Sequence, residues 1–590
     1  MINSRAQPES GARRRGFTRT SRLVPESRLF VRYTSNGAGA TLRILGLGGS
    51  HHDFCACLVT DGRVTSAVEE ERITRKKYGY GLGPRLQRCE AGAYVLAEGG
   101  ITAADVDLVV ANDLLNPSYV LRYQDRVRWI GHHVAHAAST FYTSPFERAA
   151  VLVMDGRGSE LTVDGVRRGE TISSYTGDAS GIRVVRAVHG RLGAAARVPD
   201  ESYEDSVGWL YEAVAKAIGL TTTGDVGAPG KAMGLAPYGT RRYVDDLAAF
   251  YRLTDGEFRQ SAQQQQALLA FAAAQLQRAG EGQAAEEVRA DLAYAVQANT
   301  ERIVLELARW LHRVTGEKAL CLAGGVALNS VANFKILQET PFEELYVVPA
   351  AGDHGTAIGA ALYGHHDLAG HPWVPAPEPF SPYLGRHYDA AQIDAALEPY
   401  LDRVTVERGA DVVQRTAEDL AQGLIVGWFQ GRSEVGPRAL GNRSIFADPR
   451  DPAMKDRINA KVKHREPFRP FAPVVTEANQ AALFSTAVPA YYMLIVPQVR
   501  ESARHRIPAV THVDGSARLQ TASPVLNPRL CDLLEAFDRR TGVPVLLNTS
   551  FNDNEEPIVE TPGDAIRCFL RTDLDRLVLG DVLVRKVEDR

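Results

Sequence analysis

The first half of the chain contains two apolar runs that end in a similar way. Residues 42–48 (LRILGLG) have the pattern of a buried strand closed by glycines, and two further strands are predicted at 55–60 and 63–68, joined by the turn Asp61-Gly62. Residues 149–154 (AAVLVM) form a second buried run, which ends in the glycine-rich polar segment DGRGS. This repeat of a buried strand with a polar exit predicts two similarly built halves.

Residues 319–322 form a further buried strand, which runs into the sequence AGGVALN and a predicted helix. Glycines between a strand and a helix let the backbone approach a nucleotide closely. We therefore expect Gly324, Gly325 and Asn329 to contact a nucleotide. Lys231, in GKAMGLAPYG, is also a candidate phosphate contact, but the sequence lacks a GxxxxGK motif, and a loop with a structural role is the favoured interpretation.

Helical periodicity and prolines divide the rest of the chain. Residues 262–315 are predicted to be helical, with apolar spacing close to 3.6 that indicates packing. The proline-rich segment 371–379 cannot continue a helix or an inner strand and marks a domain junction, beyond which strands are predicted at 424–429 and 543–547. The predicted order is a disordered extension at 1–40, a first domain at 41–370, a linker at 371–386 and a second α/β domain at 387–590.

Composition narrows the class of protein. The chain of 590 residues has a net charge of −4 and 45% hydrophobic residues, which is enough for at least two domains. Six scattered cysteines without a CxxC pair disfavour a disulfide framework or a zinc ribbon and indicate a reducing cytoplasm. Neither a run of about eighteen apolar residues nor an apolar segment behind Arg13-Arg14-Arg15 is present, so no membrane span or secretory signal is predicted.

The basic charge is concentrated between Gly431 and Phe471, where seven Arg and three Lys face five acidic residues. The segment therefore carries +5 and the remainder −9, which favours a small anionic ligand over a nucleic acid. Arginine forks bind phosphate or carboxylate through paired hydrogen bonds, and glycines let backbone amides approach the same oxygens. A solvated basic loop is the alternative, although interleaved phenylalanines argue against it. The candidate ligand-binding residues of this domain are Arg438, Arg443, Lys461, Arg465, Arg469 and Arg518, with Asn442 and Asn548 as neutral donors.

The sequence GHHVAHA places His132 and His136 four residues apart, so both imidazoles project from one helical face. Such a pair binds a metal or is satisfied by ordinary hydrogen bonds, and the spacing alone leaves both readings open. Asp155 favours a metal because it ends a buried strand, where α/β folds usually bind ligands. Asp353, in AGDHGT, offers a fourth ligand. Two imidazoles and two carboxylates suit iron, manganese or zinc.

His52 follows the first strand directly, in GGSHHDF, and is expected to lie over the same crevice. An imidazole can take a proton from a substrate hydroxyl near neutral pH, which makes His52 a candidate acid or base. A histidine that only caps the loop is equally compatible with this position. Two anion-binding regions and a metal crevice in one chain suggest two linked reactions.

The chain resembles the NodU/CmcH-type O-carbamoyltransferase family in eight ordered motifs, SHHDFCACLVTDGRVTSAVEEERITRKKYG, GHHVAHAASTFY, VMDGRGSE, GKAMGLAPYG, AGGVALNSVAN, GRSEVGPRALGNRS, REPFRPFAP and LNTSFNDNEEPIVETP. The resemblance extends from Leu42 to Lys586. It implies an α/β chain with an N-terminal actin-like (ASKHA, Kae1-like) domain followed by a C-terminal YrdC-like domain. Fold analogy alone would not fix the function, but motifs of both sites are present.

The resemblance implies that the second domain uses ATP, with Mg²⁺, and carbamoyl phosphate to form carbamoyladenylate. The first domain would then carbamoylate a hydroxyl of a secondary metabolite such as a glycosylated macrolide, ansamycin, aminoglycoside or cephem. His52 matches the proposed general base of the family. Because the basic charge is local and no long apolar run is present, neither a nucleic-acid nor a membrane partner is expected, and a homodimer is left open. The resemblance also implies a divalent metal, iron first and manganese or zinc as alternatives, on His132, His136, Asp155 and Asp353.

Two other functions stay open at this point. One is threonylcarbamoyl transfer to tRNA, which lacks the support of a broad basic surface. The other is a non-enzymatic, ATP-gated binding protein, which would not require the basic segment. The chain departs from the family pattern at three positions. Phe54 is expected to make the floor of the acceptor pocket bulkier, His354 to perturb the surroundings of the metal, and Phe334 replaces a common glycine.

Overall fold

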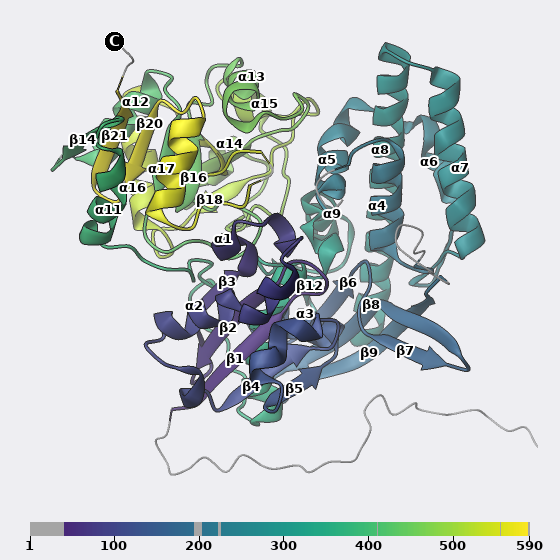
Figure 1. Ribbon diagram of the computed structural model, residues 1–590. Coiled ribbons are helices and arrows are strands. Elements are labelled where there is room, and N and C mark those ends of the chain that lie inside the picture. Colours follow the sequence, from purple (N-terminus) through teal and green to yellow (C-terminus); the bar gives the residue numbers. More distant parts are fainter. Residues whose placement is uncertain (1–40, 194–202, 222–225, 410, 555, 588–590) are drawn as a thin grey trace, which may run out of the picture. The chain divides into compact units, whose positions relative to one another are not determined.

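The computed structural model describes residues 41–193, 203–221, 226–409, 411–554 and 556–587. The extension predicted at 1–40 lies outside these residues, and the remainder of the chain forms one compact unit. Helices and strands alternate along the described chain and three large sheets carry it, so the fold is mixed α/β, as predicted (Figure 1). None of the described helices is both long enough and apolar enough to cross a membrane.

The first two sheets share one strand order. The strands of the first sheet are β1 (Arg43–Gly48), β2 (Cys55–Thr60), β3 (Arg63–Glu69), β4 (Leu108–Asn112) and β5 (Val127–Ile130). Those of the second are β6 (Ala149–Met154), β7 (Glu160–Val163), β8 (Val166–Asp178), β9 (Gly181–Arg191), β12 (Ala319–Ala323) and β13 (Glu344–Val347). The central strand β1 pairs antiparallel with β2 and parallel with β4, just as β6 pairs antiparallel with β8 and parallel with β12. The outer strands β3 and β5 correspond to β9 and β13. This repeat confirms the prediction of two similarly built halves.

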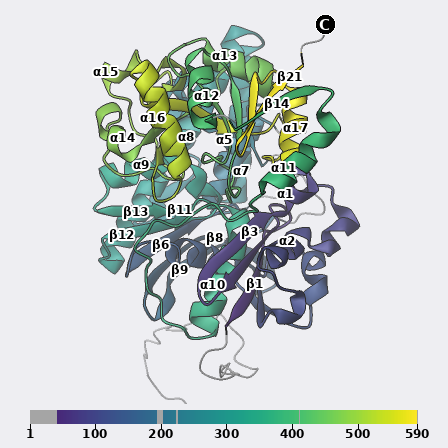
Figure 2. The same cartoon turned by 90° about the vertical axis from the view of Figure 1, so that its left-hand side faces the viewer.

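Two helices, α3 (His132–Phe141) and α10 (Thr356–Tyr363), pack against each other between these sheets. Helix α10 lies on β1, as Figure 2 shows, and α3 lies on β6 and β12. Glycines allow this close packing, since a Cβ at Gly48 would lie 2.2 Å from a backbone nitrogen of α10, and a Cβ at Gly359 would lie 1.7 Å from a carbonyl oxygen of α3. The start of α10 is therefore held beside α3.

The helical stretch predicted at 262–315 consists of two helices, α7 (Ala262–Ala279) and α8 (Gln283–Thr315), which run side by side in Figure 1. Gly280 and Gly282 separate them with φ of 71° and 76°, in the left-handed region that interrupts a helix. One face of α8 is buried, which confirms its predicted packing role.

The third sheet contains the strands β14 (Val404–Arg408), β15 (Val426–Phe429), β16 (Arg443–Ala447), β17 (Ala472–Thr476), β18 (Gln520–Ala522), β19 (Val545–Ser550), β20 (Arg576–Leu579) and β21 (Val582–Lys586). Its two faces support separate cores, because successive side chains of a strand point to opposite sides. Trp428 packs with the helices α12 (Val412–Ala421) and α16 (Pro528–Thr541), whereas Phe429 packs in the core that includes α11 (Ala390–Leu397) and α17 (Pro562–Arg571).

Residues 371–386, predicted to be a linker, contain no helix or regular strand in the structure. They are nevertheless packed, since Trp373 and Leu384 join the core of the first two sheets and Tyr383 forms an isolated bridge with Glu434. The boundaries of the two predicted domains stay a prediction, and so do their actin-like and YrdC-like assignments.

Candidate active site

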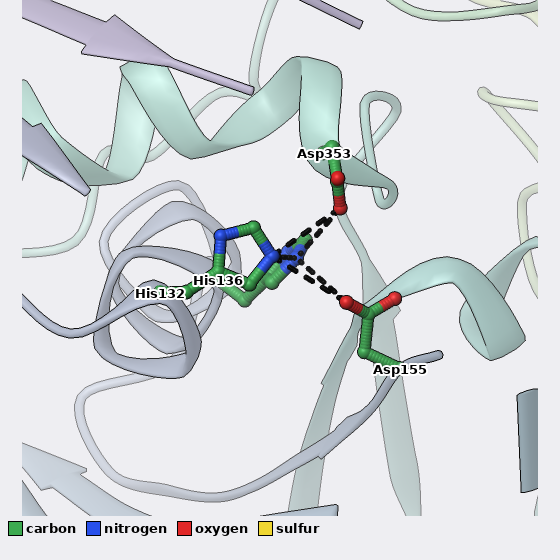
Figure 3. Close-up of side chains that lie close together, drawn as sticks. All are labelled: His132, His136, Asp155 and Asp353. Atoms are coloured by element: carbon green, nitrogen blue, oxygen red, sulfur yellow. Dashed lines mark hydrogen bonds and ion pairs between the residues drawn. The ribbon is translucent and has the colours of Figure 1, made fainter. Parts of the chain in front are cut away.

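His132, His136, Asp155 and Asp353 lie together in the structure (Figure 3). The histidines come from successive turns of α3, Asp155 directly follows β6, and Asp353 lies just before α10. Their four ligand atoms lie within 4.8 Å of one another. Asp353 Oδ1 is 3.3 Å from His132 Nε2 and 3.4 Å from His136 Nε2, and Asp155 Oδ2 is 3.4 Å from His132 Nε2. We call these four residues the His/Asp cluster.

The electrostatics of the His/Asp cluster fit a bound cation. All four side chains are buried, and the two Nε2 atoms face each other at 3.1 Å. Burial would lower the pKa of His132, but Asp353 and Asp155 outweigh it and raise the pKa to about 10. Burial would raise the pKa of both carboxyl groups, but the histidines hold it below its usual range. Imidazole nitrogens and carboxylates that converge on one point form a donor set for iron, manganese or zinc.

Neighbouring polar groups orient the His/Asp cluster. Asn112 Nδ2 lies 2.6 Å from His132 Nδ1 and donates to the carbonyl oxygen of Gly49 at 2.8 Å. The N–H of Gly325 donates to Asp155 Oδ1 at 2.9 Å. Groups behind a metal ligand commonly fix its orientation in this way. Asn112 was not predicted from the sequence. Its position at the end of the buried strand β4 resembles that of Asp155, which follows the buried strand β6.

His52 lies in the loop after β1, with Nδ1 3.1 Å from Asp53 Oδ2. Burial lowers the pKa of His52, but Asp53, Asp353 and Asp155 outweigh it and raise the pKa to about 9. The imidazole is then protonated at neutral pH. It can act as a base only when the charge of the nearby carboxylates is neutralised, because their field is what stabilises the imidazolium.

A cavity of about 1930 Å³ joins the His/Asp cluster to the basic segment. Its lining includes His52, Asp155 and Asp353 in one part and Arg438 and Arg518 in another. Pockets for one small molecule usually measure roughly 300–1,000 Å³. The cavity therefore has room for more than one ligand between the two groups of residues.

Four arginines, Arg438, Arg465, Arg469 and Arg518, line the cavity and form what we call the arginine array. Within the described chain, Arg438 and Arg518 have no hydrogen-bond or ion-pair partner. Burial and the neighbouring Arg469 lower the pKa of Arg438 to about 10, and burial together with the other three arginines lowers the pKa of Arg518 strongly. A bound anion would relieve this repulsion and supply the missing partners.

Arg443, predicted to bind ligand, does not line the cavity. It is fully buried in β16, where its guanidinium donates to the carbonyl oxygen of Gln430 at 2.5 Å and stacks on Phe429 at 3.6 Å. Asn442 is likewise committed to its own loop, donating to the carbonyl oxygen of Arg432 at 2.8 Å. Both residues shape the basic segment from within. Contrary to the prediction, neither Arg443 nor Asn442 lines the cavity in which a ligand would bind.

Lys461 was also predicted to bind ligand, but its side chain is exposed and does not line the cavity. Lys463 lines it instead, because the helical turn at Asn459–Lys463 sends residues two apart in different directions. Lys463 Nζ is buried and donates to Asn552 Oδ1 at 2.7 Å and to the carbonyl oxygen of Ser550 at 2.8 Å. The signal for Lys463 was present in the same KVK sequence. Asn548 lines the cavity, with a buried Oδ1 that has no partner in the described chain, and its contact with a ligand stays a prediction.

The residues predicted to bind a nucleotide in the first half have mixed positions. Gly325 and Asn329 line the cavity, whereas Gly324 and Lys231 do not. The Asn329 side chain caps helix α9 (Ser330–Glu339) and exchanges hydrogen bonds with Gln297. Lys231 lies in helix α5 (Ala228–Leu235), not in a loop, and forms an ion pair with Glu466 at 2.6 Å. It therefore ties the basic segment to the first half of the chain.

The three departures from the family pattern also have places in the structure. Phe54 is buried against Tyr119, with ring centroids 5.2 Å apart, and does not line the cavity, so the expected bulkier floor is wrong. His354 and Phe334 do line it. The pKa of His354 is lowered because its ring is buried. An uncharged imidazole therefore stands beside Asp353.

Comparison with protein families gives two matches. The model described as Carbamoyltransferase N-terminus matches residues 43–123 and 119–362, and the model described as Carbamoyltransferase C-terminus matches residues 417–586. The first includes the His/Asp cluster, and the second includes the arginine array. The residues of the shared cavity thus fall in both matched regions.

Curated relatives agree with these matches. The nodulation protein NolNO of Sinorhizobium fredii is 37% identical over 91% of this chain and 79% of that protein. A 3'-hydroxymethylcephem-O-carbamoyltransferase of Streptomyces clavuligerus is 35% identical over 49% of this chain and 53% of that protein. Among solved structures, full-length HypF in a phosphate- and nucleotide-bound form has 14% identity and a TM-score of 0.38, covering 57% of each chain. Similarity to a structure at that level supports no conclusion.

Proposed function

Because the chain belongs to the carbamoyltransferase family, we propose that it is an ATP-dependent O-carbamoyltransferase that acts on a hydroxyl of a small secondary metabolite. The observation that carries the proposal is the shared cavity, onto which an anion-binding array and a candidate metal site both open. An enzyme that activates a donor in one place and transfers it in another needs both sites within one enclosure. The repeated sheet order supports an actin-like first domain, and we keep the YrdC-like second domain as part of the proposal.

The proposed donor is carbamoyl phosphate, activated in two steps at the arginine array. Water first releases phosphate and leaves carbamate, and a carbamate oxygen then attacks the α-phosphorus of ATP, which releases pyrophosphate and forms carbamoyladenylate. Arg438 and Arg518 bind phosphoryl oxygens, because guanidinium groups without protein partners are free to do so. Lys463 and Asn548 also line the cavity, but their donors are committed within the protein, Lys463 Nζ to Ser550 and Asn552 and Asn548 Nδ2 to Gln520 and Ala439, so the phosphoryl contacts are assigned to the arginines.

The proposed transfer takes place beside the His/Asp cluster. The acceptor oxygen forms a bond to the carbamoyl carbon, the bond to AMP breaks, and the hydroxyl proton passes to His52. A divalent metal, iron first with manganese or zinc as alternatives, would be held by the cluster and would polarise the carbonyl group. Asp53 contributes most to the raised pKa of His52, followed by Asp353 and Asp155. The charge of a metal would neutralise Asp353 and Asp155 and so lower the pKa of His52 towards a value at which its imidazole can accept a proton.

The acceptor is proposed only by class. The cephem relative is named for carbamoylation of a hydroxymethyl group, and we extend that chemistry to alcohols of glycosylated macrolides, ansamycins, aminoglycosides and cephems. Three aromatic side chains, Tyr78, Tyr80 and Trp209, line the cavity, and the ring of Tyr80 lies 6.0 Å from that of His52. Such aromatic side chains suit a bulky acceptor that is largely apolar.

Pyrophosphate exchange into ATP tests the activation step without knowledge of the acceptor. Protein with ATP, Mg²⁺ and labelled pyrophosphate should exchange label only when carbamoyl phosphate is added. A panel of the four alcohol classes, supplied with each candidate metal, should then show the mass gain of one carbamoyl group. Absence of exchange that depends on carbamoyl phosphate would falsify the proposed function.

A further inference from the structure

The Gly436 peptide lies where distant parts of the chain meet. Gly436 belongs to the loop between β15 and β16, shortly before Arg438. Its N–H donates to Glu69 Oε1 at 2.5 Å, and its carbonyl oxygen accepts from Arg72 Nη2 at 2.7 Å, both within the protein interior. Glu69 ends β3 and Arg72 lies in helix α1 (Glu70–Thr74). Both backbone polar groups of Gly436, the N–H of the peptide before it and the carbonyl of the peptide after it, are therefore held by the first half of the chain.

On its other side, Gly436 touches the segment that leads to Asp353. Its φ of 102° lies in the left-handed region, and a Cβ there would lie 2.7 Å from the carbonyl oxygen of Pro349. Pro349 shortly precedes Asp353, a member of the His/Asp cluster. Gly436 thus sets the spacing between the loop that carries Arg438 and the loop that carries Asp353.

The side chains that hold this peptide are committed to it. Arg72 Nε is 3.7 Å from Glu69 and 3.8 Å from Glu71, and Arg72 is 2% exposed. In the described chain, Arg72 Nε and Nη1 have no hydrogen-bond partner, so the bond from Nη2 to Gly436 is the strongest directional contact of the guanidinium. A buried ion pair is a weak source of stability compared with apolar packing. The main effect of Glu69 and Arg72 is therefore expected on the position of Gly436 and not on the overall stability.

We propose that Glu69 and Arg72 are positioning residues that form a clamp on Gly436, one holding its N–H and the other its carbonyl oxygen. The clamp keeps the arginine array and the His/Asp cluster on one shared cavity, so that carbamoyladenylate is retained until transfer. The inference rests on the proposed function and deepens it, because it assigns retention of the intermediate to two residues outside the His/Asp cluster and the arginine array, of which Glu69 lines the cavity.

Release of AMP without an acceptor tests the clamp. Wild-type protein given ATP, Mg²⁺ and carbamoyl phosphate should release AMP slowly, because the intermediate stays enclosed. Arg72→Leu and Glu69→Ala each remove one hydrogen bond to Gly436 and should speed AMP release at least about fivefold, since the adenylate escapes and hydrolyses. Pyrophosphate exchange that depends on carbamoyl phosphate should stay within about twofold of wild type in both variants, because the array itself is untouched.

Two matched variants separate retention from general damage. Glu69→Gln keeps an oxygen that can accept from the Gly436 N–H and should release AMP at close to the wild-type rate. Arg432→Leu removes hydrogen bonds to the carbonyl oxygens of Thr65 and Leu384, a similar contact between distant segments that does not involve Gly436, and should also leave AMP release unchanged. If melting curves show that Arg72→Leu does not fold, the two Glu69 variants decide the question.

The outcomes are distinguishable. Exchange in wild type, with faster AMP release only in Arg72→Leu and Glu69→Ala, supports the clamp. Exchange with unchanged AMP release in both variants overturns the clamp and leaves the proposed function standing. Loss of exchange in the variants alone also overturns it, because their role would then lie in activation. No exchange even in wild type removes the proposed function, and the clamp with it.

Discussion

The His/Asp cluster and the arginine array open onto one cavity but are built on opposite electrostatic principles. In the cluster, imidazoles and carboxylates face each other at 3.3 to 3.9 Å, so the protein balances most of its own charge. In the array, four like charges converge, and Arg438 and Arg518 have no protein partner in the described chain. The cluster is anchored at strand and helix ends, whereas the array is held by irregular segments.

This difference indicates that the arginine array depends more on a bound ligand for its polar contacts than the His/Asp cluster does. Removing a cation from the cluster leaves hydrogen bonds between its members, because the histidines can take up protons. Removing an anion from the array leaves buried guanidinium groups that only water can satisfy. We therefore expect the array to gain more order on binding than the cluster does.

The largest effect should come from breaking the cluster. Asp155→Ala removes one carboxylate from the four ligand atoms and should lower carbamoyl transfer by more than about 100-fold, with loss of bound metal. Carbamoyl phosphate-dependent pyrophosphate exchange should persist, because the array is unchanged. Metal analysis and exchange on the same preparation check both statements. Simultaneous loss of transfer and exchange in a folded variant would contradict this division of labour.

A smaller effect is expected from breaking the array. Arg518→Ala should slow pyrophosphate exchange about 10- to 100-fold, the cost of one charge-assisted hydrogen bond. Lys461→Ala is the matched control, since it removes one positive charge from an exposed position of the second half of the chain that does not line the cavity. Exchange rates at saturating ATP measure the difference. Equal rates for the two variants would remove Arg518 from the proposed donor site.

The smallest effect on catalysis is expected from substitution of His133. Its pKa is shifted in the opposite direction to that of its neighbour His132 in helix α3. Burial lowers the pKa of His133 to about 4, whereas carboxylates raise that of its neighbour His132. The unfolded chain, with a histidine pKa of about 6.5, therefore binds the proton more readily. The contribution of His133 is fully present above pH 6.5, and about 3 kcal/mol of unfolding free energy is lost as the pH falls from 6.5 towards 4.

Urea unfolding across this pH range checks the linkage at His133. His133→Gln cannot titrate and should show a shallower loss of stability between pH 6.5 and 4 than wild type. The polar contact to Ser173 Oγ, 2.8 Å from His133 Nδ1, can be kept by the glutamine amide. Parallel stability curves for the two proteins over this range would show that His133 is not the titrating group.

Part of the candidate site could be predicted because local patterns carry it. The spacing of His132 and His136 places them on one helical face, and Asp155 follows an apolar run that had to be a buried strand. Arg438, Arg465 and Arg469 were predicted from charge density and Arg518 as an addition from a separate turn, and all four line the cavity. Asn112 was missed because a single asparagine after a strand is a common turn signal as well.

The direction of individual side chains in the basic segment could not be predicted. Lys461 and Lys463 are the same residue type two positions apart, yet Lys461 is exposed and Lys463 is buried. Arg443 has the same charge as Arg438 but lies in β16, where carbonyl oxygens and Phe429 occupy its guanidinium. Charge density reports how many cations a segment holds, and only the packed backbone decides which of them face a ligand.

Local sequence patterns established the two buried strands with polar exits, the pairing of His132 with His136 on one helical face and the location of the basic charge, since each depends on residues close together in the chain. The tertiary structure decided that Asp353 reaches the histidines, which requires α10 to pack on α3 through Gly359. It also decided that the cluster and the array share one cavity, with Gly436 held by Glu69 and Arg72. Contacts of this kind join residues hundreds of positions apart, and they are set by close packing that no local pattern encodes.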